Sequence, residues 1–179
     1  YIKENRMSRL LERATVVFAS EENSNDIAEK VLSLQEMKVI LSGLEEQNKP
    51  SKVIIFILCG YYGFDRALIV KFFSLPWTCV DYEHCYFELE GKKYPMVEKL
   101  AKWLKEKQRE YKEKGVKPTA INVIRKGEKY FPAKKDTVNA LFDEDIKIMD
   151  KNNERINTLT PQKMRAIVIY STFPADIFE

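Results

Sequence analysis

Hydrophobic residues recur at helical spacing along most of the chain. In residues 35–47 they fall at Met37, Ile40, Leu41 and Leu44, which is the spacing of one face of a helix. Residues 95–114 repeat the pattern, and Gly115 is suited to end that helix. Further helices are predicted near the start of residues 1–20 and at 27–34, 136–149 and 160–172. The pattern therefore predicts a mainly α-helical domain.

The most apolar segment covers residues 53–73 and is interrupted by Gly60-Tyr-Tyr-Gly63. We predict two buried helices joined at these glycines. A strand at residues 53–58 is the competing interpretation, because periodicity cannot distinguish short apolar runs. The two glycines also match the GxxG spacing of KH domains, whose loop clamps a nucleic-acid backbone. Because Tyr61 and Tyr62 are bulky, a turn between helices is the favoured interpretation.

Alternating residues predict a small amount of sheet. Residues 78–94 alternate and turn at Glu90-Gly91, as a small β-hairpin does. Residues 117–135 contain Pro118, Gly127 and Pro132, which predicts an irregular basic connection with a short extended piece near 120–124. The predicted organisation is N-terminal helices or an arm at 1–50, followed by a helical core at 51–179. The fold class is thus mainly α, with one small β-hairpin.

Positive charge is concentrated in residues 92–135. This segment holds fifteen Lys or Arg and five Glu, a net charge of +10, whereas the whole chain carries +3. The rest of the chain is therefore negative, at −7. Aromatic residues are interleaved with the cations, namely Trp103, Tyr111, Tyr130 and Phe131. Such a concentration predicts a surface for a polyanion.

The charge and the aromatic residues together predict single-stranded nucleic acid, RNA in particular, as the partner. Cations bind phosphates with release of counterions, and aromatic rings stack on unpaired bases. The expected stacking residues are Trp103 and Tyr130, whereas Tyr111 is expected in the core. The expected phosphate contacts are Lys102, Lys105, Arg109, Lys112, Arg125, Lys126 and Lys129. No catalytic signature competes with this surface, so we expect binding without chemistry and without a cofactor.

Two other interpretations of the basic surface remain open. The helix at 95–114 is also explained as a solvated face with pairs such as Glu98–Lys102 and Glu110–Lys114. In functional terms, a helical interaction module could present this face to an acidic protein or an anionic membrane.

A metal-dependent nuclease is the catalytic alternative. Carboxylates on adjacent strands can hold a divalent ion while a lysine orients the attacking water. Asp81, Glu90 and Lys92 offer these residue types. A hairpin with charged ends explains the same residues.

The cysteine and histidine content bears on metal binding and compartment. Cys79, Asp81, His84 and Cys85 are metal-capable, but one His and no CxxC pair make a closed tetrahedral site a poor explanation, so buried thiols are expected. Three cysteines and no Asn-x-Ser/Thr motif predict a reducing compartment, the cytoplasm or nucleus. The longest apolar run, residues 53–59, is too short to cross a bilayer, which predicts no membrane insertion. The chain starts with Tyr1 rather than Met, which indicates a fragment or a processed product.

Two motifs together resemble the nucleoproteins of phenuiviruses and tenuiviruses. Residues 61–69, TyrTyrGlyPheAspArgAlaLeuIle, resemble the family's glycine-aromatic-Asp start of a helix. Residues 159–167, LeuThrProGlnLysMetArgAlaIle, followed by Phe173-Pro174, resemble a later helix of that family. The resemblance implies a helical protein that coats single-stranded viral RNA in a basic groove and forms homo-oligomers through an N-terminal arm. Only Asp65 and Arg165 would carry over, as structural or groove positions.

Overall fold

The most apolar segment of the chain forms a central buried helix. In the computed structural model, which describes residues 33–116, 118–132, 146–147, 158–159 and 175–178, this helix is α4 (Pro50–Gly60). Proline occupies the first turn, where a backbone N–H has no partner within the helix. All residues from 52 to 60 are buried. The prediction of a helix here is confirmed, and the competing strand at 53–58 is wrong.

A tight turn leads from α4 into a second buried helix, α5 (Arg66–Phe73). Gly63 has φ +68°, a conformation that glycine adopts without strain. Asp65 is the N-cap, and its carboxylate accepts a hydrogen bond of 2.8 Å from the Leu68 amide. The segment from Gly60 to Gly63 is therefore the predicted helix–helix turn rather than an exposed nucleic-acid loop.

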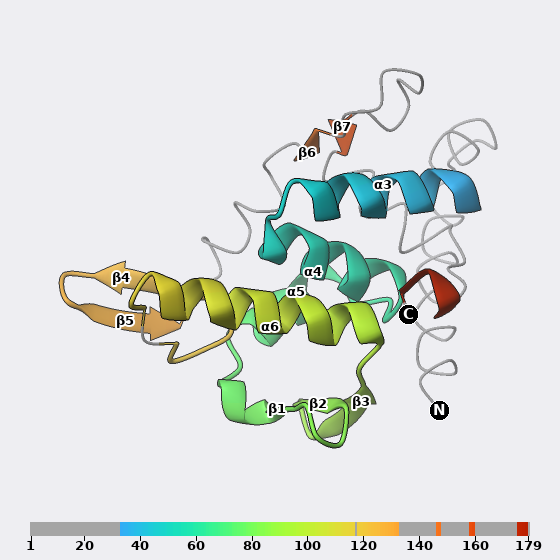
Figure 1. Cartoon of the computed structure of the whole chain (residues 1–179). Helices are drawn as coiled ribbons and strands as arrows, with labels where there is room; N and C mark the ends of the chain where they lie inside the picture. The colour runs from blue at the N-terminus through green and yellow to red at the C-terminus, as the bar shows by residue number, and fades with distance from the viewer. Residues whose placement is uncertain (1–32, 117, 133–145, 148–157, 160–174, 179) are drawn as a thin grey trace, which may run out of the picture.

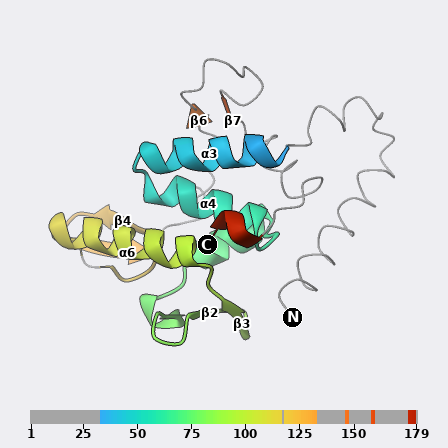
Figure 2. The ribbon, with the colours of Figure 1, turned by 45° about the vertical axis from the view of Figure 1, so that its right-hand side comes forward.

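Two further helices pack on α4 from opposite sides. α3 (Leu34–Glu46) lies on one side and α6 (Glu98–Glu113) on the other, as both views show (Figure 1, Figure 2). Ser33 and Glu36 form a capping box that starts α3. The prediction of helices at 35–47 and 95–114 is confirmed, within a few residues at each end.

The inner face of α3 joins the same core as α4 and α6. Met37, Ile40, Leu41 and Leu44 are at most 2% exposed and belong to the buried cluster that contains α4. The described part of the first fifty residues is thus a layer of the core. The expected N-terminal arm and helices within residues 1–32 lie outside the described residues.

The predicted hairpin at 78–94 forms and gains a third strand. β2 (Tyr86–Leu89) pairs with β3 (Lys92–Pro95), and β1 (Val80–Asp81) pairs with the other edge of β2. Glu90 and Gly91 have φ of 52° and 76°, as the two central positions of a type I′ turn require. This part of the prediction is confirmed.

An aromatic cluster joins this sheet to the helices. Phe87 of β2 lies 5.1–5.4 Å, between ring centroids, from Tyr62, Phe72 and Tyr94. The Tyr62 hydroxyl donates to the carbonyl of Pro95 at 2.7 Å and accepts from the Val97 amide at 3.1 Å. Burial raises the pKa of Tyr62, so this hydroxyl stays protonated and keeps its bond to β3. The cluster fixes β2 and β3 beneath the helices.

Two small sheets were not predicted. β4 (Val123–Lys126) pairs with β5 (Lys129–Pro132) where an irregular basic connection with a short extended piece near 120–124 was expected, so the prediction covers only the start of β4. β6 (Ile146–Lys147) pairs with β7 (Thr158–Leu159), so the expected helix over 136–149 is wrong at Ile146. The remainder of that helix and the one expected at 160–172 lie outside the described residues. The second hairpin was missed because four of its six residues nearest the turn are charged, which hides the alternation.

Among the described residues, helices predominate and several short strands accompany them, so the fold is mixed α/β rather than helical with one hairpin. Two short 3₁₀ helices complete it, η1 (Trp77–Cys79) and η2 (Ala175–Phe178). Phe178 of η2 is fully buried and lies 5.8 Å and 6.5 Å, between ring centroids, from Tyr61 and Phe56. Residues 175–178 therefore pack beside α4 and the residue that follows this helix.

Candidate nucleic-acid interface

The predicted basic row lies on the exposed face of α6. The opposite face of this helix is buried and includes Leu100, Trp103 and Leu104. The four cations of the row recur every three or four residues, which places them along one side of the helix. All four are exposed, namely Lys102, Lys105, Arg109 and Lys112.

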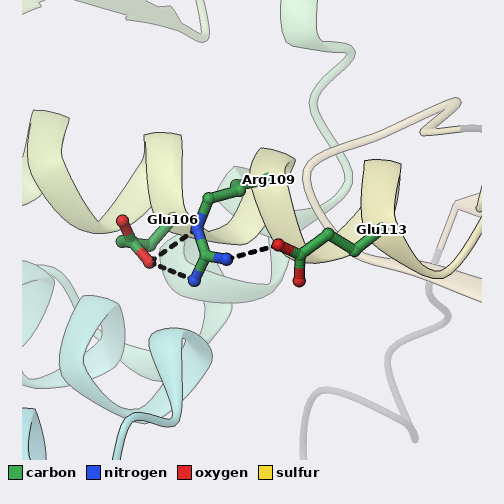
Figure 3. A network of polar contacts seen from close by, with 3 residues as sticks. All are labelled: Glu106, Arg109 and Glu113. Carbon is green, nitrogen blue, oxygen red and sulfur yellow. Dashed lines mark hydrogen bonds and ion pairs between the residues drawn. The ribbon is translucent and has the colours of Figure 1, made fainter.

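Arg109 is held by carboxylates of its own helix. Its Nε and one terminal nitrogen donate to Glu106 at 3.2 Å and 2.7 Å, and the other terminal nitrogen donates to Glu113 at 2.6 Å (Figure 3). Hydrogen bonding from Arg109 holds the pKa of Glu106 below its ordinary value, and the same contacts raise the pKa of Arg109. A phosphate bound at Arg109 would have to compete with two carboxylates.

The other cations of the row differ in their surroundings. Lys102 Nζ lies 3.9 Å from a Glu45 carboxylate oxygen, and Lys105 Nζ lies 5.2 Å from the centre of the Tyr82 ring. Lys112 forms no ion pair with another described residue. At the end of the helix, Lys114 pairs with Glu110 at 2.7 Å, which was one of the pairs predicted for a solvated face. The row is therefore partly neutralised: Arg109 and Lys102 lie near carboxylates, whereas Lys105 and Lys112 form no ion pair with a described residue.

Trp103 is a core residue, which corrects the prediction that it stacks on bases. Its side chain is 4% exposed, and its Nε1 donates to Glu45 at 3.1 Å. Glu45 also accepts a hydrogen bond of 2.7 Å from Lys99. Trp103 thus joins α6 to α3, and its ring has no face available to a ligand.

The remaining predicted cations lie on the hairpin β4–β5, which extends past the C-terminal end of α6 (Figure 1). Arg125, Lys126 and Lys129 are all exposed around its two-residue turn. Gly127 has φ +63°, and its carbonyl accepts a hydrogen bond of 2.8 Å from Arg125 Nε. Tyr130 is half-buried. The structure therefore places these four predicted residues on one projecting element.

Tyr111 fixes the base of the hairpin to α6. Its hydroxyl lies 3.2 Å from the Ile121 carbonyl and from the Asn122 side-chain oxygen, and it accepts a hydrogen bond of 3.3 Å from the Val123 amide. Burial raises the pKa of Tyr111 to about 12, so the hydroxyl keeps its proton at neutral pH. Tyr111 is half-buried and lies outside the core cluster in which it was expected, and its hydroxyl holds the hairpin to α6.

A buried amine lies beside this anchor. Lys107 is 6% exposed, and its Nζ lies 2.6 Å from Ser51 Oγ and 3.4 Å from the Asn122 side-chain oxygen. The Tyr111 ring centre is 5.0 Å away. Burial lowers the pKa of Lys107 to about 8. Lys107 therefore connects α4 and α6 to the residues that precede β4, and it is not part of the exposed row.

The structure does not assemble the predicted nuclease site. Asp81 lies opposite Tyr86 at one end of β2, whereas Glu90 follows the other end, about 13 Å along the strand. Glu90 pairs with Lys71, and Asp81 pairs with His84 at 2.8 Å. Amide hydrogen bonding from His84 lowers the pKa of Asp81. Lys92 adjoins Glu90 at the turn, far from Asp81, so these three side chains cannot share one metal ion.

The metal-capable residues near β1 are also not arranged as a ligand set. Cys85 Sγ lies 3.5 Å from the Tyr82 carbonyl, and Cys79 is half-buried. No group of three His, Cys, Asp or Glu side chains within the described ranges is placed to hold a metal ion. All three cysteines are free thiols, and Cys59 is the buried one; the prediction of buried thiols is wrong for Cys85, which is exposed.

Comparison with known proteins found no matching family model, no matching curated protein and no matching solved structure. The resemblance to phenuivirus and tenuivirus nucleoproteins therefore stays a prediction. Of its two transferable residues, Asp65 is the N-cap of α5 and Arg165 lies outside the described residues. No helix in the described part of the chain is long and apolar enough to cross a membrane.

Phe131 is a candidate contact residue that the predicted set did not include. It is 42% exposed and is the exposed large hydrophobic residue of the described chain. The signal in the sequence was the pair Gly127-Glu128, which lies between Lys126 and Lys129 and suits a two-residue hairpin turn. Recognising that turn would have placed Phe131 on a hairpin beside Lys129.

Proposed function

We propose that this protein binds single-stranded nucleic acid, RNA in particular, through the hairpin β4–β5 and the C-terminal end of α6. The observation that carries the proposal is the projecting hairpin itself. It presents three exposed cations around one turn, with an exposed aromatic ring beside them. Cations along a backbone and a ring for unpaired bases are the two components that single-strand binding uses.

The hairpin is a better phosphate-binding element than the middle of α6. A phosphate approaching Arg109 meets Glu106 and Glu113, which already satisfy the guanidinium. The hairpin carries one acidic residue, Glu128, against three cations. Lys112 adds a fourth cation where α6 meets the base of the hairpin through Tyr111. We therefore place the main contacts at Lys112, Arg125, Lys126 and Lys129, with Lys102 and Lys105 at the margin.

Charge reversal on the hairpin tests this proposal. The double variant Lys126→Glu/Lys129→Glu is expected to lower the affinity for a labelled single-stranded RNA at least about tenfold, because each reversal removes a phosphate contact and adds repulsion. The measurement is fluorescence anisotropy at low salt. Both side chains are exposed, so the circular dichroism spectrum and thermal midpoint are expected to stay unchanged.

A matched control separates a local contact from a change in net charge. Lys38 of α3 and Lys49, the N-cap of α4, are both exposed and belong neither to α6 nor to the hairpin β4–β5. The double variant Lys38→Glu/Lys49→Glu changes the net charge by the same amount and is expected to keep most of the affinity. Equal losses in the two double variants, or no loss in the hairpin variant, would refute the assignment.

A further inference from the structure

The two faces of the hairpin β4–β5 differ in chemistry. Lys126 and Lys129 are opposite each other across the turn, and side chains two residues apart on a strand share a face. Phe131 therefore lies on the same face as Lys126 and Lys129. Both lysines are exposed, and the Phe131 ring is 42% exposed.

The opposite face carries Arg125 and Tyr130, which form a cross-strand pair. Arg125 Nε donates to the Gly127 carbonyl, which ties its guanidinium to the turn. Tyr130 is half-buried, so less of its ring is accessible than that of Phe131. This face supports the turn, whereas the lysine–phenylalanine face presents a ring to solvent.

We propose that the face formed by Lys126, Lys129 and Phe131 selects unpaired strands, with Phe131 stacked on a base and the two lysines on adjacent phosphates. This inference rests on the proposed function and assigns its specificity to one face and one ring. A phenyl ring has no hydrogen-bonding group, so it binds by stacking on the flat face of a base and cannot hydrogen-bond to base edges. Bases in a duplex are stacked on both sides and offer no such surface.

A duplex is the alternative ligand that this geometry must exclude. A two-stranded ribbon can enter the major groove of DNA, where polar side chains bind base edges. The face described here offers two lysines and a phenyl ring, which cannot provide the bidentate contacts typical of groove recognition. A duplex would therefore meet only the lysines, through its phosphates.

The test compares Phe131→Ala with Phe131→Trp on two probes, a labelled single-stranded RNA and the same strand annealed to its complement. Phe131→Ala is expected to weaken single-strand binding about 5- to 150-fold and to leave duplex binding within about twofold, because only the stacking contact is lost. Phe131→Trp is expected to retain the single-strand affinity. The matched control is Tyr130→Ala, on the opposite face. We expect it to weaken single-strand binding less than Phe131→Ala does.

The outcomes separate this inference from the proposed function. One outcome refutes only the inference: the wild-type protein binds, Lys126→Glu/Lys129→Glu abolishes binding, and Phe131→Ala changes the affinity for neither the single-stranded nor the duplex probe. The proposed function would then stand. A larger loss for Tyr130→Ala than for Phe131→Ala would refute the choice of face. Equal losses on both probes would refute the selection of single strands, and no wild-type binding at low salt would refute both proposals.

Discussion

Replacement of Phe87 by alanine is expected to lower the free energy of unfolding by about 3–5 kcal/mol, because it leaves a cavity at the centre of the aromatic cluster. Phe87 is fully buried. Its ring stacks on Tyr94 at 5.2 Å and meets the edges of Tyr62 and Phe72 at 5.4 Å and 5.1 Å between centroids. These contacts hold the β2–β3 hairpin against α5 and the turn before it. Urea denaturation followed by circular dichroism measures the effect.

The cost is large compared with the stability of an ordinary domain, about 5–15 kcal/mol, so a milder substitution is useful. Phe87→Leu retains much of the side-chain volume and is expected to cost about 1–2 kcal/mol. Phe131→Ala removes the same side chain from an exposed position and is expected to cost less than about 0.5 kcal/mol. Similar losses for Phe87→Ala and Phe131→Ala would contradict the described core.

Lys107→Met is expected to stabilise the protein at pH 7, and this advantage is expected to shrink by about 2–3 kcal/mol between pH 7 and pH 10. Burial lowers the pKa of Lys107 from 10.5 to about 8, so the folded protein binds the proton more weakly than the unfolded chain does. The unfolded chain therefore holds more protons between these two values, and the stability of the wild-type protein rises with pH over that window. Methionine has no proton to bind and lacks this rise.

The surroundings of Lys107 support the direction of this effect. No carboxylate lies within ion-pair distance of its Nζ among the described residues, and its polar partners are Ser51 and Asn122. Asn122 keeps a partner in the variant, because the Tyr111 hydroxyl also contacts it. The measurement is the free energy of unfolding of both proteins at several pH values.

Lys105→Met is the matched control, since Lys105 lies one half-turn earlier on α6 and is exposed. Its stability relative to the wild-type protein is expected to be nearly constant with pH. A difference between wild type and Lys107→Met that does not change from pH 7 to pH 10 would show that Lys107 titrates as an ordinary lysine, contrary to its burial.

The helices and the first hairpin were predictable because local signals and tertiary packing agree there. The apolar stripe of α3, Pro50 at the start of α4 and the Glu90-Gly91 turn each specify one local structure. The helical spacing of the charged residues likewise predicted which side of α6 is exposed. Confirmed elements are thus those in which the spacing of residues carries most of the information.

The errors arose where the outcome depends on residues far apart in the sequence. The position of Trp103 among lysines predicts a stacking residue, but the helical period turns it inward to Glu45, which is 58 residues away. Arg109 was expected to be available, although Glu106 and Glu113 occur at the spacing that lets them pair with it. Asp81 and Glu90 lie close in sequence, but β2 separates them. Spacing alone does not show which partner a charged side chain takes.

The β4–β5 hairpin was missed for a different reason. Its residues are mostly charged or aromatic, and the apolar alternation that marks a half-buried strand is absent. The strands are instead positioned by Tyr111 and by two amide hydrogen bonds, from Ile121 to the Leu75 carbonyl just after α5 at 2.8 Å and from Asn122 to the Phe73 carbonyl at the end of α5 at 2.9 Å. Such anchoring comes from the tertiary fold, and it turns an apparent basic linker into the candidate binding element.

The most direct test of the central claim is the salt dependence of wild-type binding to a labelled single-stranded RNA, followed by fluorescence anisotropy. Contacts from Lys112, Arg125, Lys126 and Lys129 predict a slope of log affinity against log salt of about −3, since each phosphate contact on a single strand contributes about −0.7. Binding that weakens along this slope would support the phosphate-binding hairpin. No binding at low salt, or an affinity that does not change with salt, would contradict it.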